Sequence, residues 1–285
     1  MDTPPRVRSA SDIVVKDCQE CYKSMSGDMG YPSKSASLDD KMAEDEKEYT
    51  IFSKCAAEFI AVLLFVYVGS MQGVGAMGHD GVVHAAITHG VAIFVLAATF
   101  GGVSGAHVNP AVTIGIGIVG RINPVHAVCY IVSQLLGSVF GALLVRISLS
   151  DAQYNAILGG ATLCAAKTSW YTGLTAEIIT TYILVQTVLM TAVDTDKNRL
   201  APLAIGFSLI IEIMAAGAIS GASMNPARSF GPNILGQIFL PHATIDASYM
   251  FWNFHWIYYL GPIAGAFLAG GVYRIFFARD YRLMA

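Results

Sequence analysis

Long apolar stretches separated by short polar segments dominate the chain beyond residue 54. Six of them have about the 20 residues that a helix needs to cross the hydrocarbon core of a bilayer, and they lack the alternation of a half-buried strand. They are residues 55–76, 83–102, 124–146, 172–193, 201–220 and 253–277. Since the backbone polar groups of a segment in lipid must be satisfied within it, we predict six membrane-spanning helices.

Two further apolar segments, residues 107–120 and 223–236, have 14 residues each and are too short to span. Both contain Asn-Pro-Ala near the start, and the two copies are Asn109-Pro110-Ala111 and Asn225-Pro226-Ala227. Asn is a favoured N-cap and Pro is favoured in the first helical turn, so the tripeptide is a sensible helix start. We therefore predict two half-helices that enter the membrane without crossing it.

The two motifs belong to an internal repeat. Residues 104–111 and 220–227 are identical at six of eight positions, at an offset of 116 residues. A second match is the dipeptide Ala57-Glu58, which recurs as Ala176-Glu177 at an offset of 119 residues. Each half then holds three spans, which is an odd number, so the second half enters the membrane from the opposite side. The pattern predicts an inverted repeat with its functional site near the midplane.

In such a repeat the half-helices enter from opposite faces and point their N-termini at each other. Each N-terminus carries roughly +0.5 elementary charge, and the amides of Asn109 and Asn225 can donate hydrogen bonds to the oxygen of a passing solute. A positive centre of this kind disfavours cations and orients waters oppositely on its two sides, which interrupts proton hopping. The motifs therefore predict a passive path for uncharged molecules.

The composition agrees with a membrane protein. Hydrophobic residues make up 54% of the 285 residues and charged residues 13%, against roughly 25% charged residues in soluble domains. With 17 Lys and Arg against 20 Asp and Glu, no nucleic-acid partner is expected. Five scattered cysteines are too few for a disulfide framework, and they are Cys18, Cys21, Cys55, Cys129 and Cys164.

The charged residues concentrate at the N-terminal end, where residues 1–54 hold 8 of the 17 basic and 11 of the 20 acidic residues. We expect a disordered cytosolic tail over 1–50, a channel domain over 51–278 and a cytosolic C-terminal tail over 279–285. Within the domain, repeat one covers 51–146 and repeat two covers 172–277. Basic residues on the side of the tails predict that both termini are cytosolic, and they are Arg121, Lys197, Arg199, Arg279 and Arg282.

On these motifs the sequence resembles the aquaporin (major intrinsic protein) family over about residues 55–277. The pair His89-Gly90 and the segments 221–228 and 252–258 make it most similar to the aquaporin-8 type, also called aquaammoniaporins. The resemblance implies an all-α membrane fold with six transmembrane helices and two re-entrant half-helices. It also implies a homotetramer in lipid, with one pore per subunit. The residues themselves show no metal cluster and no nucleophile–base constellation, so we expect no cofactor, no metal and no catalytic residue. The location is expected to be the plasma membrane or an organelle membrane.

The resemblance assigns a selectivity filter to His89, Ile213, Ala222 and Arg228. A charge within a membrane helix costs roughly 2.5–3.5 kcal/mol on insertion scales, so Arg228 is expected beside a water-filled path rather than snorkelling to the interface. His89, taken alone, could be a satisfied core histidine. Because Ile213 is apolar, we expect a filter that passes water, ammonia and hydrogen peroxide. Ser229 stands where glycerol channels of the family carry Asp, which argues against glycerol as the main solute.

Several buried polar residues allow two interpretations. Glu58 and Glu177 could relay protons, but their repeat symmetry favours a structural role in capping backbone N–H groups near the half-helices. Glu212 could affect the electrostatics of the pore or hydrogen-bond away from it. His107 could line the pore, as the resemblance suggests, or stabilise its loop. A proton-coupled secondary transporter that uses these acids is the alternative function, and a membrane-structural protein with an occluded pore is a third.

Overall fold

The computed structural model describes residues 48–75, 81–165, 168–194, 198–240 and 251–278. All of these except Glu48 belong to one structural unit, residues 49–285. The predicted tails, 1–50 and 279–285, therefore lie almost entirely outside the described residues, as does Lys197.

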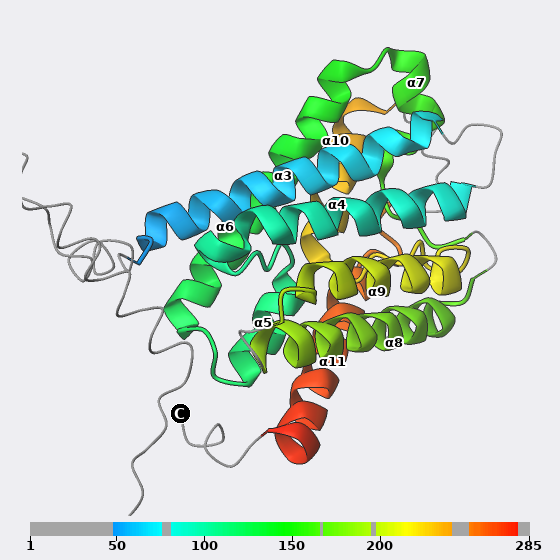
Figure 1. The fold of residues 1–285 in the computed structure, drawn as a ribbon. Coiled ribbons are helices and arrows are strands. Elements are labelled where there is room, and N and C mark those ends of the chain that lie inside the picture. Colours follow the sequence, from blue (N-terminus) through cyan, green and yellow to red (C-terminus); the bar gives the residue numbers. More distant parts are fainter. Residues whose placement is uncertain (1–47, 76–80, 166–167, 195–197, 241–250, 279–285) are drawn as a thin grey trace, which may run out of the picture. The chain divides into compact units, whose positions relative to one another are not determined.

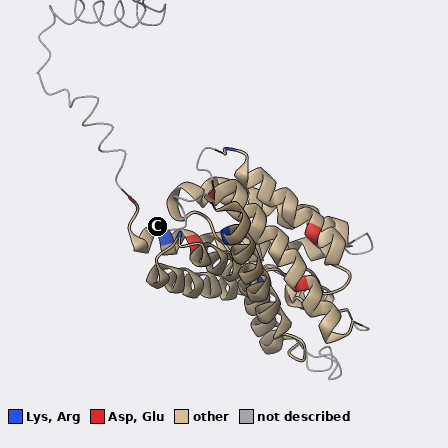
Figure 2. Ribbon diagram, turned by 90° about the horizontal axis from the view of Figure 1, so that it is seen from below, with Lys and Arg blue, Asp and Glu red and all other residues tan. Residues whose placement is uncertain are grey.

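Regular structure in the described part of the chain is helical throughout, and six helices lie where the spans were predicted (Figure 1). They are α3 (Ile51–Gly75), α4 (Gly81–Ser104), α6 (Pro124–Ser148), α8 (Trp170–Val188), α9 (Ala201–Ala216) and α11 (Ile257–Val272). A π-helical turn extends α8 as η2 (Leu189–Val193), and another extends α11 as η3 (Tyr273–Phe277). Among the described residues, five helices are long and apolar enough to cross a membrane. Figure 2 shows how few charged residues the helices carry.

The fifth segment differs from its prediction. Helix α9 has 16 residues and ends at Ala216, whereas the apolar pattern continues to residue 220. Residues 217–220 form turns that lead into Gly221, whose positive φ of 82° a helix cannot continue through. The apolar residues beyond Ala216 therefore belong to the loop before the second half-helix.

The half-helices α5 (Pro110–Ile118) and α10 (Pro226–Phe239) begin at the prolines of the two motifs. Asn109 and Asn225 are the N-caps, and each side-chain oxygen accepts the N–H of the alanine two residues on, at 2.8 Å and 3.0 Å. Non-helical loops replace the first three residues of each predicted segment.

The packing of the helices has an approximate twofold symmetry. Helix α3 packs on α6 and α4, as α8 packs on α11 and α9, and α4 against α9 joins the two halves. Helix α10 packs on α6, and α5 packs on α11. Each half-helix thus rests on a long helix of the other repeat, as the inverted repeat predicts.

Small residues let these helices approach closely, which is how helices associate in lipid. A Cβ on Gly137 of α6 would collide with the carbonyl of Phe59 in α3. Where the two halves cross, a Cβ on Gly90 would lie 2.5 Å from the carbonyl oxygen of Gly206, and one on Gly206 would lie 2.7 Å from that of Gly90. Because backbone carbonyl oxygens block the space on both sides, movement of side chains alone could not make room for a Cβ.

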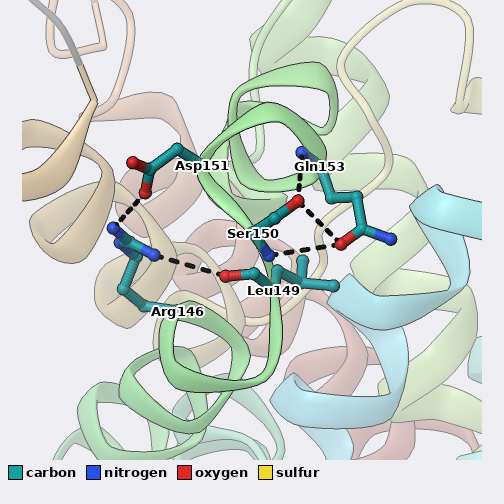
Figure 3. Close-up of polar contacts among 5 residues, drawn as sticks. All are labelled: Arg146, Leu149, Ser150, Asp151 and Gln153. Atoms are coloured by element: carbon teal, nitrogen blue, oxygen red, sulfur yellow. Dashed lines mark hydrogen bonds and ion pairs between the residues drawn. The ribbon is translucent and has the colours of Figure 1, made fainter.

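The connection between the repeats holds a short helix that the sequence analysis did not predict, α7 (Asp151–Ala156), followed by the 3-10 turn η1 (Leu158–Gly160). Ser150 and Gln153 form a capping box, in which Gln153 Oε1 accepts from the backbone N–H of Ser150 at 3.2 Å (Figure 3). Arg146 at the end of α6 pairs with Asp151 at 2.5 Å. The Ser-x-x-Gln spacing is a recognisable helix-start signal.

Replacing Gly137 by Ala should lower the melting temperature of the detergent-solubilised protein, because overpacking against a backbone carbonyl costs about 1–3 kcal/mol. Gly271→Ala is the matched control, since a Cβ there meets nothing within 4 Å. It should leave the melting temperature unchanged or raise it, given that Ala favours a helix over Gly by about 1 kcal/mol. Equal melting temperatures for the two variants would contradict the close contact between α3 and α6.

Candidate functional site

Two matching loops precede the half-helices, and both have an unusual backbone. Positive φ angles occur at equivalent positions of the two repeats: Gly105 (87°), Ala106 (47°) and Val108 (55°), and Gly221 (82°), Ala222 (44°) and Met224 (53°). Such a conformation costs on the order of 1–3 kcal/mol for each residue with a side chain and persists only when the surroundings enforce it. The loops must therefore be held from outside.

Glu58 on α3 holds the first loop. Its carboxylate is fully buried and accepts from the Ser104 hydroxyl at 2.6 Å and from the backbone N–H groups of His107 and Val108 at 2.9 and 2.8 Å. Gln134 Nε2 on α6 donates a fourth hydrogen bond at 2.9 Å. These donors satisfy the carboxylate, and they fix the backbone up to the residue before Asn109.

Glu177 on α8 holds the second loop in the same way. It is fully buried and accepts from the Ser220 hydroxyl at 2.7 Å and from the N–H groups of Ser223 and Met224 at 2.9 and 2.7 Å. A tyrosine also contacts each loop, since Tyr130 donates to the carbonyl of Ser104 at 2.9 Å and Tyr258 to that of Ser220 at 2.6 Å. The two repeats therefore use one design.

The two asparagines connect the loops to each other. Asn109 Nδ2 donates to the carbonyl of Met224 at 2.7 Å, and Asn225 Nδ2 donates to the carbonyl of Val108 at 2.9 Å. Each amide caps its own helix through oxygen and reaches the other repeat through one of its two N–H groups. The N-termini of α5 and α10 consequently meet, as the sequence predicts.

Two cavities adjoin this centre. The larger has a volume of about 440 Å³ and is lined by Asn109, Asn225 and His107 among others. The smaller has about 40 Å³, close to the roughly 30 Å³ that one molecule occupies in liquid water. Phe65, Leu209 and Ser223 line both cavities, which makes the two neighbours along one path.

The structure brings together the residues for which a filter was predicted. His89, Ile213, Ala222 and Arg228 all line the small cavity. The remaining motif residues are buried in the first turns of α5 and α10 and line neither cavity, and they are Pro110, Ala111, Pro226 and Ala227. They shape the helix starts, while the asparagines reach the path.

The side chain of Arg228 is held by the connection between the repeats. Its Nη1 donates to the carbonyl of Gly160 at 3.2 Å and to the hydroxyl of Thr162. Sequence reasoning missed both partners, because this segment has no apolar periodicity and no match in the other repeat. The position of the Arg228 side chain thus depends on contacts with residues more than 60 positions earlier in the chain.

His89 is positioned within α4. Its Nδ1 lies 2.8 Å from the carbonyl of Ala85, one turn earlier, so Nδ1 carries the proton and Nε2 is free to accept in the neutral ring. The ring packs edge-on against Phe65, with centroids 5.5 Å apart. Gly69 makes room for it, since a Cβ there would collide with Nε2.

His107 and Glu212 have different surroundings. The His107 ring lines the larger cavity, with Nδ1 at 3.1 Å from the Thr113 hydroxyl and its centroid 5.1 Å from that of Tyr130. It therefore both stabilises its loop and faces the cavity. Glu212 is buried, accepts from the hydroxyl of Ser208 in its own helix and lines neither of the two cavities.

Comparison with known proteins agrees with this geometry. The family model described as Major intrinsic protein matches residues 46–273. Probable aquaporin TIP1-2 of Oryza sativa subsp. japonica is 41% identical over 232 residues, covering 78% of this chain and 85% of that protein. Aquaporin-8 of Rattus norvegicus is 35% identical over 224 residues, covering 78% and 80%. Similarity thus extends to both kinds of aquaporin, with the higher identity to the plant protein.

A solved structure supports the fold alone. The X-ray structure of the aquaglyceroporin from Plasmodium falciparum matches with a TM-score of 0.67, over 79% of this chain and 96% of that one, at 20% identity.

Glu177→Gln should destabilise the protein by about 1–3 kcal/mol. The amide nitrogen of Gln is itself a hydrogen-bond donor, and it would face the buried donors of the loop that now bond to the carboxylate. The measurement is the melting temperature in detergent. Asp151→Asn is the matched control, since its side chain is 82% exposed and an exposed ion pair contributes about 1 kcal/mol at most. Equal melting temperatures for the two variants would show that the carboxylate does not hold the second loop.

Proposed function

The chain belongs to the major intrinsic protein family, and we propose that it is a passive channel for water and small neutral solutes. Members of this family are integral membrane proteins with several spans, which agrees with the apolar helices. The observation that carries the proposal is the small cavity, about 40 Å³ in volume, whose lining includes His89, Ile213, Ala222 and Arg228.

We propose that this cavity is the selectivity filter. Its lining is polar at Arg228 and His89 and apolar at Ile213 and Ala222. A molecule that passes it exchanges part of its hydration for a few hydrogen bonds, which a small neutral solute tolerates and an ion does not. Ammonia and hydrogen peroxide, as well as water, meet that condition.

We propose that cations and protons are excluded twice along the path. Arg228 puts a positive charge at the small cavity, and the facing N-termini of α5 and α10 put two partial positive charges at the asparagines. The second N–H of each Asn amide is left to donate to a solute oxygen, which turns waters in opposite directions on either side. His107 lines the larger cavity beyond this point.

The contacts of the buried acids favour a channel over a proton-coupled transporter. A coupled carrier needs an acid that exchanges protons along the path. Glu58 and Glu177 are engaged by several loop donors each, and Glu212 lies outside the lining of the two described cavities. We therefore propose structural roles for Glu58 and Glu177.

Further features of the proposal follow from the family resemblance and the distribution of basic residues. They are a homotetramer with one pore per subunit, both termini in the cytosol, and a location in the plasma membrane or an organelle membrane. Arg121 and Arg199, in described loop segments, belong to the side assigned to the cytosol.

Stopped-flow permeability of proteoliposomes to water, ammonia, hydrogen peroxide and glycerol tests the proposed function. We expect water permeability above that of empty liposomes, with glycerol the least permeant. An ionophore that collapses the pH gradient should leave permeability unchanged. Concentrative uptake that the ionophore abolishes would establish the transporter instead, and permeability equal to that of empty liposomes would indicate an occluded pore.

Arg228→Val should raise the permeability to glycerol and to protons several-fold, because it widens the small cavity and removes its charge. Swelling in glycerol and the quenching of an internal pH dye measure the two effects. Arg199→Val is the control, since Arg199 is exposed and lines neither cavity. Unchanged selectivity in Arg228→Val would contradict the proposed filter.

His89→Phe should reduce ammonia permeability relative to water permeability, because it removes a polar imidazole from the lining of the small cavity and adds bulk. His84→Phe, in the same helix and outside the lining of both cavities, should leave the ratio of the two permeabilities unchanged. If both variants have the ratio of the unmodified protein, His89 does not control passage.

A further inference from the structure

Helices α3 and α6 meet along a row of small residues on α6. Every fourth residue belongs to it: Cys129, Ser133, Gly137 and Gly141. Gly137 lies against the carbonyl of Phe59, and a Cβ on Gly141 would lie 2.5 Å from that of Leu63, so both helices advance together by four residues. One turn before Phe59 is Cys55, which this register sets beside Ser133 and within reach of Cys129.

The contacts of Cys55 agree with the register. The Cys55 thiol lies within interaction range of the Ser133 hydroxyl and the Cys129 thiol, and Glu58 is also near it. Cys55 and Cys129 are free and half-buried. Both lie within six residues of the start of their helices, at Ile51 and Pro124, so the pair is near one end of the bundle.

We propose that Cys55 and Cys129 are a redox-active dithiol that hydrogen peroxide converts into a reversible disulfide. One sulfur attacks a peroxide oxygen, the O–O bond breaks, and the displaced hydroxide takes the thiol proton and leaves as water. The second sulfur then attacks the sulfenic acid and displaces another water. Two thiols and one peroxide thus give one disulfide and two waters, with sulfur oxidised and oxygen reduced.

The disulfide acts on the loop before α5. A disulfide bond of about 2.05 Å draws the two sulfurs closer than any non-bonded contact between them. Cys55 precedes Glu58 by three residues, and Cys129 adjoins Tyr130, which donates to Ser104 and packs on His107. Since Glu58 and Tyr130 hold this loop, oxidation moves the wall of the larger cavity. This effect on permeability rests on the proposed channel function.

The bond itself is tested by mass spectrometry on the full chain, reduced and then exposed to hydrogen peroxide. Trypsin should release peptides 55–121 and 122–146, since the flanking basic residues are Lys54, Arg121 and Arg146. We expect these two peptides joined, with two hydrogens lost, and separated again by a reductant. Cys55→Ser and Cys129→Ser should each abolish the joined species. Cys164, a free thiol that accepts from Tyr258 at 3.6 Å, is an internal control and should stay unpaired with either peptide.

The effect on the pore is tested by stopped-flow water permeability of the same proteoliposomes when reduced, oxidised and reduced again. We expect a several-fold loss on oxidation that the reductant restores, and no change in either Ser variant. Joined peptides without a change in permeability would overturn the coupling to the pore. Isolated sulfenic acids, or no joined peptides, would overturn the dithiol site. Reduced protein that conducts no water would instead refute the channel function.

Discussion

Two buried carboxylates hold two strained loops, and the rest of the site is built on those loops. Without Glu58 and Glu177 the left-handed residues before α5 and α10 would relax, because each conformation is unfavourable by itself. The two carboxylates fix the loops and thereby the positions of Asn109 and Asn225. The hydrogen bonds of these asparagines bring the N-termini of α5 and α10 together. The shape of the path therefore depends on Glu58 and Glu177, although neither side chain lines either cavity.

The framework is symmetric, while the lining is not. Glu58 and Glu177 make matching contacts, as do Tyr130 and Tyr258. At the position equivalent to His107 of the first loop, the second loop has Ser223, which lines both cavities. Duplication explains how the two halves fit, and divergence of a few side chains explains why the large and small cavities differ in chemistry.

Much of the fold and of the candidate site was predictable from the sequence, because the signals that specify them are local or occur in both repeats. Apolar length predicts the spans, and Asn109 and Asn225 mark the helix starts through the ordinary preferences of caps. The stop of α9 at Ala216 was not predictable, since the apolar pattern runs on through residues 217–220, which form turns rather than helix. The partners of Arg228 were missed for another reason, because Gly160 and Thr162 act through tertiary contact and carry no signal in one sequence.

The exchange of hydrogen bonds between the asparagines has a consequence for biosynthesis. Asn109 donates to a carbonyl at Met224, and Asn225 donates to one at Val108. A ribosome delivers the first half of the chain more than a hundred residues before its acceptor exists. During that interval the amide of Asn109 must hydrogen-bond to water or to a chaperone instead. The first repeat can therefore complete its half of the site only after the second repeat has been synthesised.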